Sequence, residues 1–288
     1  MTKVLITGAT GNVGVMVFKA LQKYKHDLEL FAGVRNTETV NEKILNHNLK
    51  SVNFDFTNFK TFLPALENID ILFLLRPPQI SDVNSCFKPL ILAAKQARIK
   101  QIIFLSVQGV EKSKIIPHHK IEKIIIDSKI AFTFLRPAYF MQNFTTTLHQ
   151  ELVKNQRIYL PAGKAKFTII DTEDIGLVVA KVLTEPEKHI SKKYDLTNSE
   201  TLSFGEMAKK LSLGLDKEIK FISPNLFQFF ITKRREGIPT AFIFVMIMLH
   251  YLPRFQKTPK TTKWVKKITG NEAKLFDDFV LENREELV

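Results

Sequence analysis

The stretch Lys3-Val4-Leu5-Ile6-Thr7-Gly8-Ala9-Thr10-Gly11-Asn12-Val13-Gly14 decides the fold. A short apolar run leads into a glycine turn, and an apolar-periodic segment follows, which is the order strand, tight turn, helix. We expect Gly8 to allow the sharp turn, Gly11 to let backbone approach a phosphate, and Gly14 to let the helix pack closely on the strand. Glycine turns also serve plain strand-to-helix connections, but the free N–H groups and positive dipole end of such a helix suit a pyrophosphate. The stretch therefore predicts a dinucleotide site made by Gly8, Ala9, Thr10, Gly11, Asn12, Val13 and Gly14.

Apolar runs alternate with helical patterns through the first half of the chain. The expected strands are 3–7, 28–34, 51–54, 69–75, 101–106 and 130–135, and the expected helices are 12–24, 37–46, 58–66, 82–98 and 118–128. This alternation predicts an α/β fold of Rossmann type, with a doubly wound parallel sheet and helices on both faces. Ligands in such sheets bind beyond the carboxyl ends of the strands, so the residues after each strand are the candidates for chemistry.

The second half predicts a smaller, mostly helical C-terminal substrate lobe. Asp171-Thr172-Glu173-Asp174 is typical of an acidic helix start, and Ser203 with Glu206 has the spacing of a capping box. Strands are expected at 194–197 and 219–222, and the chain from Pro224 onward is helical and rich in phenylalanine. We expect a nucleotide-binding core over 1–155, with later returns to the sheet from 168–198, and the C-terminal lobe mainly over 156–288.

Composition narrows the function classes. The chain has 288 residues, 45% of them hydrophobic, and a net charge of +13. Its lysines are scattered and no nucleic-acid-binding motif accompanies them, so we expect a solvated basic surface and no nucleic-acid partner. Cys86 is the sole cysteine, which excludes an intramolecular disulfide and fits a cytoplasmic location. The apolar run 241–252 is well short of the roughly 20 residues that span a bilayer, which leaves a buried helix, a pocket lid or a membrane-surface contact.

Two strand ends bear on the nucleotide. Arg35 follows the second strand, where NAD-preferring sites usually hold an acidic residue for the ribose hydroxyl. An arginine can pair with a 2′-phosphate, so NADP(H) is preferred over NAD(H); the alternative is a surface arginine. Asp55 and Phe56 follow the third strand. The carboxylate could accept from an adenine amino group, or could equally form a turn or helix cap.

The next two strand ends carry further candidates for cofactor binding, and the helix after them carries one candidate for catalysis. Leu75, Arg76 and Pro77 begin a stiff loop that would run beside the cofactor, and Ser106 follows the fifth strand. His118 and Glu122 are four residues apart on an expected helix, hence on one face. His118 could relay a proton at neutral pH, or the two could form a structural pair that orients the helix. No spacing typical of a metal site is present.

A proline and several aromatic residues follow the sixth strand. They suit a flat apolar wall for a nicotinamide ring, although ordinary core packing would use the same residue types. The candidates are Pro137, Ala138, Tyr139, Phe140 and Asn143.

Together these residues resemble the NmrA-like atypical branch of the short-chain dehydrogenases/reductases. The resemblance includes the stretches 7–14, 34–36 and 135–143 with Ser106 and His118, and continues through 171–176, 194–198, 202–204, 268–270 and 276–279. The members most similar to it are bacterial NADPH-dependent quinone reductases and triphenylmethane-dye reductases. The resemblance implies that residues 8–13 and Arg35 hold the phosphates, and that the loops at 75–77 and 138–143 line the nicotinamide.

One departure from the wider superfamily bears on mechanism. That superfamily uses a tyrosine and a lysine four residues later, where this chain has His118 and Glu122. Hydride transfer to a quinone-like or other conjugated aromatic acceptor does not need the phenolic acid, so an NADP(H)-dependent oxidoreductase is expected. The alternatives are an NADP(H)-sensing regulator with little catalysis and, less favoured, a sugar-nucleotide epimerase. A homodimer or a protein partner stays open.

Overall fold

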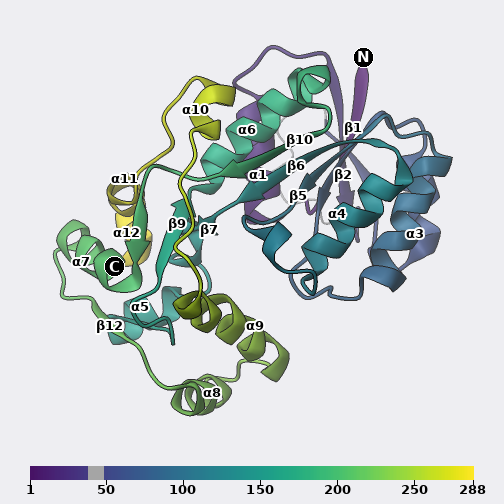
Figure 1. Cartoon of the computed structure of the whole chain (residues 1–288). Coiled ribbons are helices and arrows are strands. Elements are labelled where there is room, and N and C mark those ends of the chain that lie inside the picture. Colours follow the sequence, from purple (N-terminus) through teal and green to yellow (C-terminus); the bar gives the residue numbers. More distant parts are fainter. Residues whose placement is uncertain (38–48) are drawn as a thin grey trace. The chain divides into compact units, whose positions relative to one another are not determined.

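The computed structural model describes residues 1–37 and 49–288, so the helix expected at 37–46 lies almost wholly outside the described residues. The chain forms two compact units (Figure 1). Unit 1 comprises Met1–Pro137, Thr172–Leu196 and Trp264–Asn271. Unit 2 comprises Ala138–Asp171, Thr197–Lys263 and Glu272–Val288.

Unit 1 is built on a seven-stranded sheet, counted over the described residues, in the order β10-β6-β5-β4-β1-β2-β3. Every pair of neighbouring strands is parallel. Because β1 lies between β2 and β4, the strand order reverses there, which is the topological switch point of a doubly wound sheet. The predicted α/β fold is confirmed. The strands are β1 (Thr2–Thr7), β2 (Leu28–Val34), β3 (Lys50–Asn53), β4 (Ile71–Leu75), β5 (Gln101–Leu105), β6 (Ala131–Pro137) and β10 (Lys192–Leu196).

Helices cover both faces of this sheet. Figure 1 shows α3 and α4 together on one face, and α1 packs with α6 on the other. The strands between them are buried on both sides: Leu72, Phe73 and Leu74 of β4 have no exposed surface, as expected for a parallel sheet. The helical elements are α1 (Asn12–Leu21), η1 (Phe59–Thr61), α2 (Phe62–Leu66), α3 (Val83–Gln96), η2 (Val110–Lys112), α4 (Pro117–Ser128), α6 (Thr172–Thr184), η4 (Pro186–His189) and α10 (Trp264–Thr269).

Unit 2 is mainly helical and contains two small sheets. Strands β7 (Tyr139–Phe140), β9 (Lys166–Ile170) and β11 (Thr201–Ser203) form one, and β8 (Arg157–Tyr159) pairs with β12 (Lys220–Ile222) in the other. The Ser203–Glu206 capping box is confirmed at the start of α7. The helical elements are η3 (Met141–Asn143), α5 (His149–Asn155), α7 (Phe204–Leu215), α8 (Leu226–Arg235), α9 (Thr240–Tyr251), η5 (Leu252–Phe255), α11 (Phe276–Glu282) and α12 (Arg284–Leu287).

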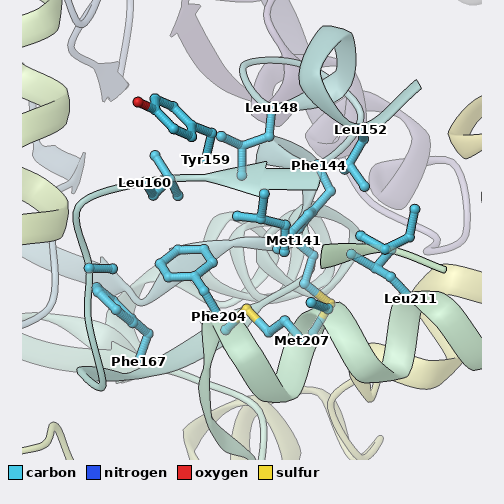
Figure 2. Close-up of a cluster of buried hydrophobic side chains, with 14 of the residues drawn as sticks. Met141, Phe144, Leu148, Leu152, Tyr159, Leu160, Phe167, Phe204, Met207 and Leu211 are labelled. Carbon is cyan, nitrogen blue, oxygen red and sulfur yellow. The ribbon is translucent and has the colours of Figure 1, made fainter. Parts of the chain in front are cut away.

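Unit 2 has its own apolar core. Figure 2 shows Met141, Phe144 and Leu148 converging with Phe204 and Met207 of α7. The apolar run 241–252 forms α9 and adds Ile243 and Met246 to this core, so one face of the helix is buried rather than the whole helix. None of the described helices is both long enough and apolar enough to cross a bilayer.

Candidate functional site

The glycine loop lies at the carboxyl end of β1, beside the switch point. Gly11 donates its backbone N–H to the Gly8 carbonyl at 3.0 Å. Val15 donates its N–H to the Gly11 carbonyl, which is the first hydrogen bond of α1. Gly11 caps the helix without a side chain. The first-turn N–H groups of a helix have no intrahelical acceptor, and Thr10, Gly11 and Asn12 are exposed here. The loop therefore presents backbone donors and the positive end of a helix dipole to an anion.

Two glycines are required by their surroundings. Gly8 has φ +62°, in the left-handed region, and a Cβ there would lie 3.1 Å from the Leu75 Cβ. A Cβ on Gly14 would lie 2.4 Å from the Gly8 carbonyl oxygen and 2.7 Å from that of Ala9. The loop thus folds back onto α1 at a distance that a side chain would prevent. This close approach forms a cradle that a phosphate fits.

A buried threonine joins the loop to the neighbouring strand. The Thr7 hydroxyl accepts from the Leu75 backbone N–H at 2.8 Å and lies 3.3 Å from the Phe73 and Leu75 carbonyl oxygens. Thr7 itself has no exposed surface. The ends of β1 and β4 are therefore held together, and residues 8–11 and 75–77 leave the sheet at one place.

The ends of β2 and β3 differ in what they offer a nucleotide. Arg35 follows β2 and is exposed, so its guanidinium is accessible. Asp55 Oδ1 accepts from both the backbone N–H and the hydroxyl of Thr57 at 2.8 Å, which is an Asx turn. Phe56 is buried, and its ring packs 4.9 Å from Phe54 and 5.3 Å from Phe87. Its ring belongs to the core, so a contact of Phe56 with cofactor would have to come from its backbone.

Beyond β4, the Arg76 guanidinium is held by neutral acceptors. Nη1 donates to the carbonyls of Pro77, Pro78 and Ile80 at 3.0, 3.1 and 2.6 Å. Nε donates to His118 Nε2 at 3.4 Å. Burial lowers the pKa of Arg76 below its usual value. The side chain thereby ties the loop after β4 to α4.

His118 is neutral in this arrangement. Part of the side chain remains exposed, but the ring lies over Phe104 at 6.0 Å and is deeply set among its neighbours. Desolvation, with the Arg76 charge as a smaller cause, lowers the pKa of His118 to about 3. Because Nε2 accepts from Arg76, it carries no proton to give, and the geometry favours an orienting group over a proton relay.

Glu122 pairs with Arg136 and not with His118. Glu122 forms two bonds with Arg136, from Nε at 3.0 Å and from Nη2 at 2.7 Å. Both side chains are mostly buried. A structural His118–Glu122 pair is therefore wrong, since helical spacing places two residues on one face but does not choose their partners.

Ser106 follows β5, and its side chain lacks a hydrogen-bond partner among the described residues. The residue is 4% exposed. Its backbone N–H donates to the Leu135 carbonyl at 2.7 Å, which fixes its position. Leu75 pairs with Leu105 across β4 and β5, so Arg76 and Ser106 leave the sheet side by side.

The predicted residues after β6 lie in two places. Pro137 ends β6, and its carbonyl accepts from the Gln108 N–H at 3.0 Å. Ala138 begins unit 2 and is buried, and Tyr139 and Phe140 form β7, paired with Ile169 and Ile170.

Within unit 2, Tyr139 forms a polar pair with His250 that the spacing of the two residues in the sequence does not indicate. His250 Nδ1 lies 2.7 Å from the Met246 carbonyl, which can only accept, so Nδ1 bears the proton and Nε2 accepts from the Tyr139 hydroxyl at 3.2 Å. Burial raises the pKa of Tyr139, an effect opposed by its hydrogen bond with Asn143, and lowers that of His250 to about 4. His250 lies within an apolar run, and only the fold shows that it faces a hydroxyl.

The described residues contain no group of three or more His, Cys, Asp or Glu side chains that could hold a metal ion. Among the described residues, the polar groups at the carboxyl edge of unit 1 include backbone donors, the exposed Arg35, Arg76 held by carbonyls, neutral His118 and Ser106, with Asp55 beyond β3. This set suits an anionic organic ligand.

Comparison with known proteins agrees with the fold. "Prestalk A differentiation protein A" of Dictyostelium discoideum is 29% identical over 281 residues, covering 97% of this chain and 91% of that protein. An NAD(P)H azoreductase of Xenophilus azovorans is 27% identical over 281 residues, with 96% of each covered. The structure of an NADPH-dependent quinone oxidoreductase of Escherichia coli complexed with NADPH superposes with a TM-score of 0.87 at 20% identity, covering 97% of this chain and 99% of that one. The profile of the NmrA-like family matches residues 1–265, and the chain therefore belongs to the NmrA-like family.

Proposed function

We propose that this protein is an NADP(H)-binding oxidoreductase that passes hydride from NADPH to a quinone-like or other conjugated acceptor. The observation that carries the proposal is the cradle of Gly8, Gly11 and Gly14 at the switch point of the sheet, which exposes helix N–H groups to a pyrophosphate. The azoreductase and the quinone oxidoreductase, both similar along nearly their whole length, have names that state this class of reaction.

The preference for NADP(H) rests on Arg35. It is exposed at the end of β2, where an acidic residue would otherwise hold the ribose hydroxyl of NAD. A guanidinium can form charge-assisted hydrogen bonds with a 2′-phosphate. One carboxylate oxygen of Asp55 accepts from Thr57 in the Asx turn. The second oxygen would accept from the adenine amino group.

The residues of unit 1 define what the protein contributes to the reaction. Bound NADPH supplies the hydride. The glycine loop and Arg35 hold the phosphates, and Leu75 and Pro77 shape the loop beside them. Neutral His118 keeps the Arg76 side chain in place rather than donating a proton, so the proton that completes reduction comes from water.

Several parts of this assignment stay predictions. Among them is the lining of the nicotinamide by Pro137, Ala138, Tyr139, Phe140 and Asn143. The cytoplasmic location and the choice between a homodimer and a protein partner also stay predictions.

The proposal is tested by combining a binding and a turnover measurement. NADPH and NADH are titrated into the purified protein by thermal shift, and NADPH oxidation is then followed with a panel of simple quinones and a cationic triphenylmethane dye. We expect a larger stabilisation by NADPH and oxidation that depends on the acceptor. Tight NADPH binding without turnover of any acceptor would contradict the enzyme proposal.

A second candidate is an NADP(H)-sensing regulator with little catalysis. It is favoured by the missing tyrosine–lysine pair and by the similarity to a protein named for differentiation rather than for a reaction. A pull-down at two NADP⁺/NADPH ratios tests it. Partner binding that ignores the ratio would contradict it.

A further inference from the structure

Three partly buried arginines of this chain have different partners. Arg136 is paired with Glu122, and Arg157 with Glu151 at 2.8 Å, and in both cases the carboxylate raises the pKa of the arginine. The pKa of Arg76 is lowered by burial. Its acceptors in the described part of the chain are three carbonyls and one neutral imidazole. The Arg76 charge is therefore half-buried without a carboxylate to balance it.

The Arg76 side chain is held in place and still has donors to offer. Nε and Nη1 are occupied by His118 and the loop carbonyls, whereas Nη2 donates to none of the residues that the structure describes. An arginine fork that is fixed through some of its donors loses little entropy when the remaining ones bind an oxygen. Arg76 is partly exposed, so a ligand can reach it.

Ser106 supplies a second, independent sign of a ligand at the same edge. Its hydroxyl is buried and unpartnered among the described residues, and leaving such a group unsatisfied is destabilising. Ser106 and Arg76 follow residues that pair across β4 and β5. The two residues therefore leave the sheet side by side, and each has a donor that no described residue accepts.

We propose that Arg76, with Ser106 beside it, binds the oxygen anion that forms on a conjugated carbonyl acceptor when it accepts hydride. The inference rests on the proposed function and names its substrate class: acceptors that become anionic, such as quinones, rather than cationic dyes. His118 is a positioning residue that holds Arg76 through Nε.

The reaction balances without a further reactant. The C4–H bond of NADPH breaks and its hydride carries two electrons to one quinone oxygen, which forms an O–H bond. NADPH is oxidised to NADP⁺, and the quinone is reduced to a hydroquinone monoanion whose other oxygen carries the charge. That oxygen binds Arg76 and then takes a proton from water. Hydride transfer to a cationic triphenylmethane dye gives a neutral product, so there Arg76 has no anion to stabilise.

The test compares two acceptors in the wild type and four variants. Arg76→Gln removes the charge, Arg76→Lys keeps it without the fork, and His118→Gln weakens the hold on Nε. Arg98→Gln is the control, because Arg98 is an exposed arginine just after α3, at the opposite edge of the sheet. The kcat/KM for a quinone and for a cationic dye is measured at saturating NADPH, and the Kd for NADPH is measured alongside.

The proposal predicts that only the quinone reaction depends on Arg76. Arg76→Gln should lower kcat/KM for the quinone by about 10²-fold, the usual scale for losing an oxyanion donor. The same change should leave the value for the dye unchanged or higher, and the NADPH Kd within about threefold. Arg76→Lys should restore much of the quinone activity, His118→Gln should lower it less than Arg76→Gln does, and Arg98→Gln should change nothing. Equal losses with both acceptors, or a weakened NADPH Kd that explains the loss, would overturn the proposal.

A binding measurement separates this proposal from the proposed function. Calorimetry with 4-nitrophenolate and with uncharged 4-nitroanisole, both in the presence of NADP⁺, reports on the anion site without turnover. If the wild-type protein reduces neither acceptor, the proposed function fails. Phenolate binding that Arg76→Gln abolishes would still support the anion site, whereas binding equal in both proteins would exclude it.

Discussion

Glu122 of α4 and Arg136 of β6 form a two-bond ion pair, with distances of 3.0 and 2.7 Å. The pair fastens the helix to the strand beside it and leaves His118, four residues earlier, to accept from Arg76. Glu122 thereby serves the fold of unit 1, while His118 and Arg76 face the carboxyl edge of the sheet. Glu122 and His118 therefore lie on one face of α4 but have different partners: Glu122 binds Arg136 of β6, and His118 binds Arg76 of the candidate site.

Removing the Glu122 carboxylate should destabilise the protein strongly. Glu122→Gln leaves the Arg136 guanidinium mostly buried without its main counter-charge, and we expect a loss of about 3 kcal/mol in the free energy of unfolding. Urea unfolding measures it. Glu111→Gln is the matched control, because Glu111 lies 3.5 Å from the same arginine but is 52% exposed, and its loss should cost less than about 1 kcal/mol. Similar losses in both variants would contradict this view of the pair.

A methyl group on Gly14 should damage the glycine loop. The Cβ of Gly14→Ala would lie 2.4 Å from the Gly8 carbonyl oxygen, so the loop or α1 must move, at a cost of about 1–3 kcal/mol. NADPH affinity, measured on the folded protein, should fall with it. Gly205→Ala is the control, since its Cβ would meet nothing closer than 3.8 Å. Unchanged NADPH affinity in Gly14→Ala would show that the close approach does not shape the site.

Replacing Arg35 should separate the two nucleotides. Arg35→Ala removes a charged donor that only the 2′-phosphate can use, so NADPH binding should weaken by roughly 1.5–3 kcal/mol while NADH binding changes little. Parallel titrations of the two nucleotides measure this difference. Equal losses would assign Arg35 to another part of the cofactor.

His250 should make stability depend on pH. Its pKa is lowered from 6.5 to about 4 by burial, so the native state stays neutral while the unfolded chain takes up a proton below pH 6.5. The stability that neutral His250 contributes is therefore fully present above pH 6.5. It is lost as the pH falls toward 4, at up to about 1.4 kcal/mol per pH unit. Between pH 7 and 5 the free energy of unfolding should drop by about 2 kcal/mol more in the wild type than in His250→Gln. Identical slopes in the two proteins would show that the pKa of His250 is the same in the native and unfolded states.

The sheet of unit 1 could be predicted from the sequence, because parallel strands buried on both faces are near-continuous apolar runs. The expected strand at 69–75 contains β4, and that at 28–34 coincides with β2. Strands β7, β8, β9 and β11 went unpredicted, because they belong to the small sheets of unit 2 and lie outside the repeated strand–helix alternation that identified the strands of unit 1.

The sequence predicts at which edge of the sheet the candidate site lies, but it does not predict which side chains contact one another there. Strand ends singled out Arg76 and Ser106 as candidates, and the helix after β5 singled out His118, because the carboxyl ends of parallel strands meet at one edge of the sheet. Which acceptor each side chain finds depends on tertiary packing, so neither the Arg76–His118 contact nor the Tyr139–His250 pair is visible in the spacing. Phe56 likewise follows a strand end, yet its ring packs into the core against Phe54 and Phe87.

Hydride transfer from bound NADPH is tested most directly by a single turnover. The protein is loaded with one equivalent of NADPH, mixed rapidly with excess quinone without oxygen, and followed by NADPH absorbance. NADPH deuterated at C4 on the transferred face is used in a parallel experiment. We expect complete oxidation of one NADPH per protein, slowed by the deuterium because the C4–H bond breaks in the step observed. An NADPH signal that persists in the bound complex at every quinone concentration would contradict it.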